Sequence, residues 1–153
     1  DFSEPYAYNR MVVIVDGNRT DIASMADLKG KNTANTISST YAEEAEKHGA
    51  KVTGVDDLNQ TFELLLSGRI DATLNSEVTF YDYLRAHPDA RIKIAAVSDH
   101  ATEVAIPIRK GEATASLRAV VNETIKGMRE SGELAALSKR FFGTDISAPA
   151  AKP

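Results

Sequence analysis

The stretch KVTGVDDLNQTFELLLSGRIDATLNSE, residues 51–77, decides the fold class because it predicts a strand, a helix and a second strand in turn. The segments 51–55 and 69–75 are short, rich in β-branched residues and bounded by turn formers, as strands are. Between them lies a helix that ends at Gly68 and carries an apolar stripe of Leu58, Phe62, Leu65 and Leu66. Such a unit predicts a mainly parallel sheet with helices on its faces.

The same alternation extends outward on both sides of this stretch. Ser24 and Asp27 have the spacing of a capping box at the start of a short helix that Gly30 ends. Strands are predicted at 10–18, 32–37, 91–98 and 102–110, and further helices at 39–49 and 76–88. The segment 32–37, NTANTI, is unusually polar for a strand. The fold class is therefore α/β.

The C-terminal part of the chain breaks this alternation. Two helices are predicted, at 113–132 and 131–143, and no strand follows them. The first carries an apolar stripe of Leu117, Val120, Val121, Ile125 and Met128. These helices either cover one face of the α/β unit or belong to a second lobe.

Composition excludes several classes of function. The 153 residues suit one domain or two small lobes, and the net charge of -4 does not favour nucleic acid as a partner. The chain has no cysteine, and its histidines lack the spacing of metal ligands. We find no apolar run long enough for a bilayer, no Ser-His-Asp order, no P-loop and no GxGxxG. Neither a cofactor nor a metal is predicted.

The first of two polar strand ends is TISSTY, residues 36–41. Here Ser38, Ser39 and Thr40 lead into a helix, whose free N–H groups and nearby hydroxyls form a site suited to a carboxylate. The alternative is that one hydroxyl caps the helix and the others belong to a loop.

The second polar strand end is LNSE, residues 74–77. Ser76 can cap the next helix, and the charge of Glu77 suits its first turn. That explanation needs no ligand. The functional alternative is that a residue here meets a ligand ammonium or amide across a crevice, since ligands bind outside the carboxyl ends of strands in such sheets.

An ordered set of segments resembles a known family. DFSEPY, ADLKGK, STYAEEAEK, SGRIDATLN, IRKGE and MRESGELAALSKRFFG occur in that order from residue 1 to about 146. Together they resemble the periplasmic polar-amino-acid-binding proteins of ABC importers (solute-binding protein family 3). Within this family, the pattern GRIDATLNSE…YDYL is most similar to the cystine-type binders.

The resemblance implies two α/β lobes that close on a ligand about a hinge. Residues 1–8 would end lobe one and approach the hinge, and 9–104 would form lobe two, a three-layer lobe. Residues 105–146 would contain the return hinge and the C-terminal helices of lobe one, followed by a disordered tail at 147–153. The N-terminal half of lobe one, which carries the family's ligand-clamping arginine, would then be missing. We therefore expect the chain alone to bind free amino acids weakly or not at all.

The resemblance also implies which residues line the ligand site. The ligand-binding set is Thr36, Ser38, Ser39, Thr40, Tyr41, Asn75 and Ser76. Ser38 stands where many members have glycine, and Ser76 stands where the family usually has the aspartate that pairs with the ligand ammonium. A neutral serine supplies no charge-assisted bond. Either ammonium binding is weaker here, or a neighbour, Glu77 or Asn75, takes the role.

The function implied is capture of a polar amino acid and its delivery to membrane permease subunits of an ABC importer, without catalytic residues. The parent protein would be secreted, periplasmic or extracellular and membrane-associated, with a signal peptide outside this chain. One alternative is a dehydratase-type enzyme on the same fold, with Glu77 as its acid or base. Another is a receptor's sensor domain. The unpartnered helices at 113–142 predict self-association of the chain.

Overall fold

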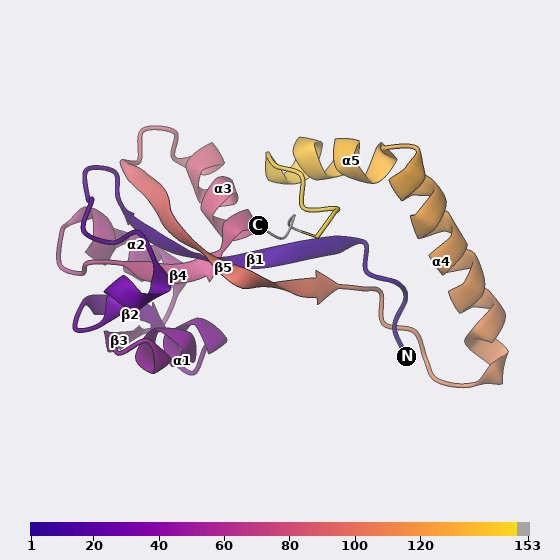
Figure 1. Cartoon of the computed structure of the whole chain (residues 1–153), viewed down its shortest axis with the longest axis horizontal. Helices are drawn as coiled ribbons and strands as arrows, with labels where there is room; N and C mark the ends of the chain where they lie inside the picture. The colour runs from indigo at the N-terminus through magenta and orange to yellow at the C-terminus, as the bar shows by residue number, and fades with distance from the viewer. Residues whose placement is uncertain (150–153) are drawn as a thin grey trace. The chain divides into compact units, whose positions relative to one another are not determined.

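The chain divides into two compact units in a computed structural model that describes residues 1–149 (Figure 1). One unit is Arg10–His100, and the other combines Asp1–Asn9 with the chain from Ala101 onward. The expected lobe boundaries, 8/9 and 104/105, lie close to these limits, and the assignment of the units to two lobes stays a prediction. The predicted tail lies outside the described residues from 150 onward.

The larger unit alternates strands and helices as the sequence predicts. Its elements are β1 (Ala7–Asp16), η1 (Met25–Leu28), β2 (Asn32–Thr36), α1 (Thr40–Lys47), β3 (Lys51–Val55), α2 (Leu58–Leu66), β4 (Thr73–Ser76), α3 (Glu77–Ala86) and β5 (Ile92–Val104). The two strands predicted at 91–98 and 102–110 form one continuous strand, β5, which ends at Val104.

The strands lie in two hydrogen-bonded groups, and only one of them is parallel. β2 and β3 are parallel, whereas β4, β1 and β5 form the second group, in which β1 and β4 are antiparallel. β1 and β5 also run in opposite directions: Tyr6 N–H donates to the Val104 carbonyl at one end, and Gly17 N–H donates to the Arg91 carbonyl at the other (Figure 1). The α/β class with mainly parallel strands is confirmed: β2, β3 and β4 run in one direction, β5 runs in the same direction, and β1 opposes them. Strand directions differ because β1 enters the unit and β5 leaves it.

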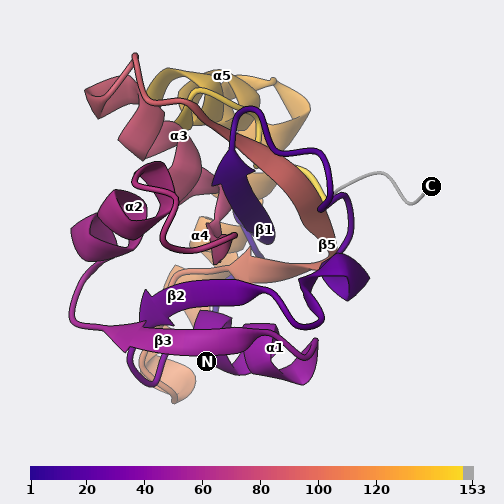
Figure 2. The same cartoon turned by 90° about the vertical axis from the view of Figure 1, so that its left-hand side faces the viewer.

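Helices cover both faces of these strands, which gives the three layers of the fold (Figure 2). Successive β1 residues face opposite sides, so Val12 and Ile14 pack in a cluster with Phe62 of α2 and Phe80 of α3. Val13 and Val15 pack on the other side with Ala45 of α1 and Leu28 of η1.

The smaller unit is helical apart from its share of β1 and β5. It contains η2 (Glu112–Thr114), α4 (Ala115–Glu130) and α5 (Glu133–Phe142), and Gly132 has the positive φ of 79° needed where α4 gives way to α5. The apolar stripe of α4 is only partly packed: Ile125 is buried, whereas Leu117 and Val120 are exposed. In the described part of the chain, no helix is long and apolar enough to cross a membrane.

The first residue of the predicted tail, Ser147, lies within the described part of the chain. Ser147 is buried, and its hydroxyl donates to the Asp145 carboxylate at 2.7 Å. The Ser147 carbonyl accepts from Arg129. The bond from Arg129 holds Ser147 against α4, and the bond to Asp145 fixes the local turn.

Candidate functional site

The first polar strand end forms a tight turn between β2 and α1. Ser39 N–H donates to the Thr36 carbonyl at 3.1 Å, and Ser38 between them has a φ of 58°. This left-handed conformation favours glycine and is uncommon for serine. Glycine at this position would adopt the same conformation without strain.

Ser39 is the cap of α1, and the other two hydroxyls are not needed for capping. The Ser39 hydroxyl oxygen accepts from the N–H of Ala42 at 3.2 Å. Ser38 and Thr40 are exposed, while Tyr41 in the first turn is half-buried. The first N–H groups of a helix lack intrahelical acceptors and favour anions. This end can therefore receive a carboxylate through N–H groups and two exposed hydroxyls.

The second polar strand end is organised by Ser76. Its hydroxyl accepts from the N–H of Thr79 at 3.1 Å and lies 2.8 Å from the Thr79 hydroxyl, so it caps α3. Asn75 accepts the N–H of Ser76 through its side-chain oxygen at 2.8 Å. Ser76 is buried and Asn75 half-buried, which leaves neutral hydrogen-bonding groups at this end.

Glu77 is buried in an ion pair. Its carboxylate lies 2.5 Å from the guanidinium of Arg10 on β1, and the exposed fractions of the two side chains are 2% and 33%. The pairing of Met11 with Ser76 in the β1–β4 register places Arg10 beside Glu77. Since the carboxylate is enclosed and already neutralised, it is poorly placed to pair with a ligand ammonium.

A buried amide that the sequence reasoning missed connects the two strand ends. Asn35 donates through Nδ2 to the Leu74 carbonyl at 2.7 Å. Thr36 and Asn75 are the next residues on the two strands, so both predicted clusters begin beside this bond. The polarity of the segment 32–37 was the signal for Asn35. Nothing in the local sequence indicated the role of Arg10.

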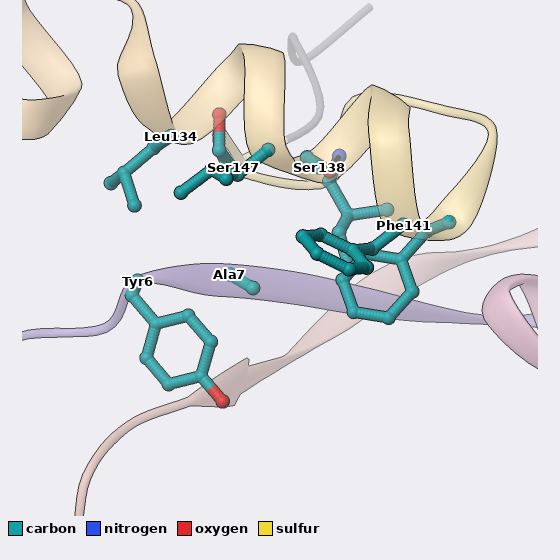
Figure 3. A pocket seen from close by; sticks show the side chains of 9 residues that line it. Tyr6, Ala7, Leu134, Ser138, Phe141 and Ser147 are labelled. Atoms are coloured by element: carbon teal, nitrogen blue, oxygen red, sulfur yellow. Dashed lines mark hydrogen bonds between the residues drawn. The ribbon is translucent and has the colours of Figure 1, made fainter.

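An apolar pocket in the smaller unit is separate from these residues. It has a volume of about 190 Å³ and lies between the N-terminal segment and α5, where it is lined by Tyr6, Ala7, Leu134, Leu137, Ser138, Phe141, Phe142, Ile146 and Ser147 (Figure 3). None of the predicted ligand-binding residues contributes to it. Its lining is unsuited to the charged ends of an amino acid. Among the described residues, no group of His, Asp and Glu could hold a metal ion.

Comparison with known proteins decides the family. The model of the bacterial extracellular solute-binding proteins, family 3, matches residues 1–144. This chain belongs to that family. The family 3 chain is 35% identical over 147 residues to the L-cystine-binding protein TcyA of Bacillus subtilis, an alignment that covers 96% of this chain and 54% of TcyA. A probable amino-acid ABC transporter-binding protein of Haemophilus influenzae is 33% identical over 146 residues, covering 95% of this chain and 56% of the relative.

A solved structure shares the fold of the family 3 chain. The L-cystine solute receptor of Neisseria gonorrhoeae, in its unliganded open conformation, superposes with a TM-score of 0.84 at 36% identity. The match covers 97% of this chain and 62% of the receptor. The chain spans about half the length of the curated relatives it matches. The resemblance drawn from the sequence is thus confirmed, whereas the roles of the individual site residues remain predictions.

Proposed function

We propose that the protein containing this family 3 chain is an extracytoplasmic solute-binding protein that captures a polar amino acid, with L-cystine as the first candidate. The observation that carries this proposal is the junction of the two polar strand ends through the Asn35–Leu74 hydrogen bond. One end offers donors to a carboxylate, and the other offers neutral groups to an amine. Relatives named as L-cystine-binding proteins support the choice of ligand.

The carboxylate of the ligand would bind at the start of α1. Thr40 would donate through its backbone N–H and hydroxyl, and the exposed Ser38 hydroxyl lies in the same turn. Hydrogen bonds to a charged group contribute about 1.5–3 kcal/mol each. The N-terminal end of the α1 dipole adds to this attraction.

The ammonium of the ligand would meet Asn75 and Ser76, which are neutral acceptors. The carboxylate of Glu77 is paired with Arg10 and is therefore not free to pair with the ligand ammonium. We therefore expect this half of the site to discriminate weakly against ligands without an ammonium group.

Delivery to an ABC permease would follow hinge closure. β1 and β5 each contain a unit boundary, at Asn9/Arg10 and at His100/Ala101, as two crossing strands of a hinge would. A ligand that contacts both lobes favours the closed state because it gains contacts only there. The protein would act outside the cytoplasmic membrane, in the periplasm or at the outer cell surface.

The burial of Glu77 argues against the enzyme alternative. A general acid or base must reach its substrate within hydrogen-bond distance, yet the Glu77 side chain is 2% exposed and bonded to Arg10. We expect no prephenate or arogenate dehydratase turnover by the full-length gene product. Turnover that is lost in Glu77→Gln would instead establish the enzyme.

Calorimetric titration of the full-length gene product with L-cystine tests the proposed function. Thr40→Ala should weaken binding by roughly 10-fold or more, since it removes a bond to a charged carboxylate. Thr53→Ala, at an exposed position in β3, is the matched control and should leave the affinity unchanged. Absence of binding to L-cystine and to other polar amino acids would overturn the proposal.

A further inference from the structure

The backbone connection between β2 and β4 ends before the strands do. The Asn32 carbonyl accepts the N–H of Asp71 at 2.7 Å and of Ala72 at 3.4 Å, and Thr33 forms a parallel bridge with Ala72. Within the described residues, the two strands otherwise belong to separate hydrogen-bonded groups. The carboxyl ends of β2 and β4, where the polar clusters lie, therefore lack a shared backbone ladder.

Two buried side chains connect the strands where the ladder stops. The hydroxyl of Thr73 donates to the Ala34 carbonyl at 2.8 Å. Asn35 donates to the Leu74 carbonyl at 2.7 Å and to the Thr73 hydroxyl at 3.3 Å. Thr73 is fully buried and Asn35 is 2% exposed. Each strand thus contributes one polar side chain that bonds to the other strand.

These polar residues are a poor choice for stability alone. Strands covered on both faces usually carry aliphatic residues, and the side-chain oxygen of Asn35 has no hydrogen-bond partner among the described residues. A buried acceptor without a partner is unfavourable. Residues that break such rules tend to occur at functional sites.

We propose that Asn35 and Thr73 are positioning residues that hold the ends of β2 and β4 at a fixed separation across the ligand crevice. Laddered strands lie about 4.8 Å apart, and a bridge that runs through a side chain spans a wider gap. The next residues, Thr36 on β2 and Asn75 on β4, then lie on opposite sides of that gap. Asn35 and Thr73 thereby set the distance between the carboxylate end and the amine end of the site. This inference rests on the proposed function.

The absence of cysteine makes the separation directly measurable. Spin labels on cysteines introduced at Glu43 of α1 and Asp82 of α3, both exposed, report the distance between the helices that follow the two strand ends. In the otherwise wild-type chain we expect one narrow distance distribution. In Asn35→Leu with Thr73→Val, the mean should change and the distribution should broaden. An unchanged distribution would overturn the proposal.

Ligand affinity should depend on the bonds between the two strands if these residues position the site. In the full-length gene product, Asn35→Leu with Thr73→Val should weaken L-cystine binding about 10-fold or more. The urea midpoint should fall too, because the buried carbonyls of Leu74 and Ala34 lose their donors.

The single variant Thr73→Ser keeps the hydroxyl and should bind L-cystine with an affinity near the wild-type value. Thr61→Val is the control and should leave the affinity unchanged. Thr61 is equally buried, but its hydroxyl donates to the carbonyl of Asp57, the cap of its own helix.

Two results would contradict the positioning role. One is unchanged affinity in the double variant. The other is an equal loss of affinity in the control Thr61→Val, which would show that the effect does not depend on the bonds between the two strands. If the wild type binds no polar amino acid, the proposed function fails, and the spin-label distances still decide whether Asn35 and Thr73 set the separation. If the double variant does not fold, Thr73→Val alone, compared with Thr73→Ser, gives the same readouts.

Discussion

One residue at each polar strand end has an unfavourable conformation or environment close to the proposed ligand site. Ser38 takes a left-handed conformation that a side chain disfavours, and it does so beside the proposed carboxylate site. Glu77 is charged yet almost fully enclosed, one position after the cap of α3. Both residues carry a local free-energy cost, and both can be tested by substitution.

Ser38→Gly should stabilise the chain. At a φ of 58°, a residue with a Cβ atom is disfavoured by roughly 1–2 kcal/mol relative to glycine. We therefore expect urea denaturation to show a gain of about 1 kcal/mol. Ser67→Gly is the control, because Ser67 has an ordinary φ of −81° and should lose stability. Equal effects at the two positions would refute the explanation.

Loss of Arg10 should lower the free energy of unfolding more than loss of Glu77. Arg10→Met leaves a buried carboxylate unpaired, which costs about 3–5 kcal/mol. Glu77→Gln leaves an arginine that is one-third exposed and can bind water, so we expect a loss of only about 1 kcal/mol. Denaturant midpoints of both variants give the order, and a larger loss in Glu77→Gln would contradict it.

Elements of the larger unit depend on close contacts between neighbours. In the β2–β3 pair, an added Cβ atom at Gly54 would lie 2.8 Å from Cγ1 of Ile37.

At the start of η1, the carboxylate of Asp27 accepts from the N–H groups of Ala23 and Ser24 and from the Ser24 hydroxyl. The predicted capping box is thus confirmed.

Gly54→Ala should destabilise the wild type and stabilise an Ile37→Ala background. In the wild type, the new methyl group overlaps Cγ1 of the exposed Ile37 side chain, which must shift, so we expect a small loss of stability. Without that side chain, alanine is preferred to glycine in a strand by about 0.5–1 kcal/mol. A double-mutant cycle followed by urea denaturation measures the coupling. The same sign in both backgrounds would exclude the contact as the cause.

The capping carboxylate of η1 should make stability depend on acid pH. The Ala23 N–H and the Ser24 hydroxyl lower the pKa of Asp27. A lowered pKa means that the carboxylate stabilises the fold above its unfolded pKa of about 3.9 and loses this effect as pH falls through the folded value. Thermal unfolding of Asp27→Asn and wild type should therefore differ at pH 7 and converge well below pH 4. A difference that does not change with pH would show that the charge plays no part.

At the scale of the whole molecule, the smaller unit exposes apolar surface. Leu117 and Val120 of α4 are 55% and 61% exposed, and Phe141 of α5 is 55% exposed. The apolar pocket of α5 adds to this surface. Leu117 and Val120 lie three positions apart on α4 and therefore share a face. An exposed apolar face tends to become an interface, and this supports the predicted self-association through 113–142.

Light scattering should show that the 153-residue chain self-associates in a concentration-dependent way. Leu117→Glu with Val120→Glu should shift the chain toward monomer, because each charge would lie in an apolar contact. Leu66→Glu, an exposed leucine of the larger unit, is the control and should leave association unchanged. A wild-type chain that stays monomeric at every concentration would refute the prediction.

Sequence alone determined the α/β class and most of the elements, although it predicted two strands where β5 is one. Periodicity and caps are local, so the start of α1 at Ser39 and of α3 at Ser76 could be predicted from the hydroxyl residues themselves. The ordered family segments added the likeness to amino-acid binders, which the comparisons confirmed.

Only the tertiary structure decided which distant residues meet. It paired Arg10 with Glu77, made β1 antiparallel to β4, and bonded Asn35 of β2 to Leu74 of β4, which is 39 positions away in the chain. Such contacts depend on strand direction and register, and no local pattern specifies either. The sequence therefore indicated polar strand ends, and the structure showed that a buried amide joins them.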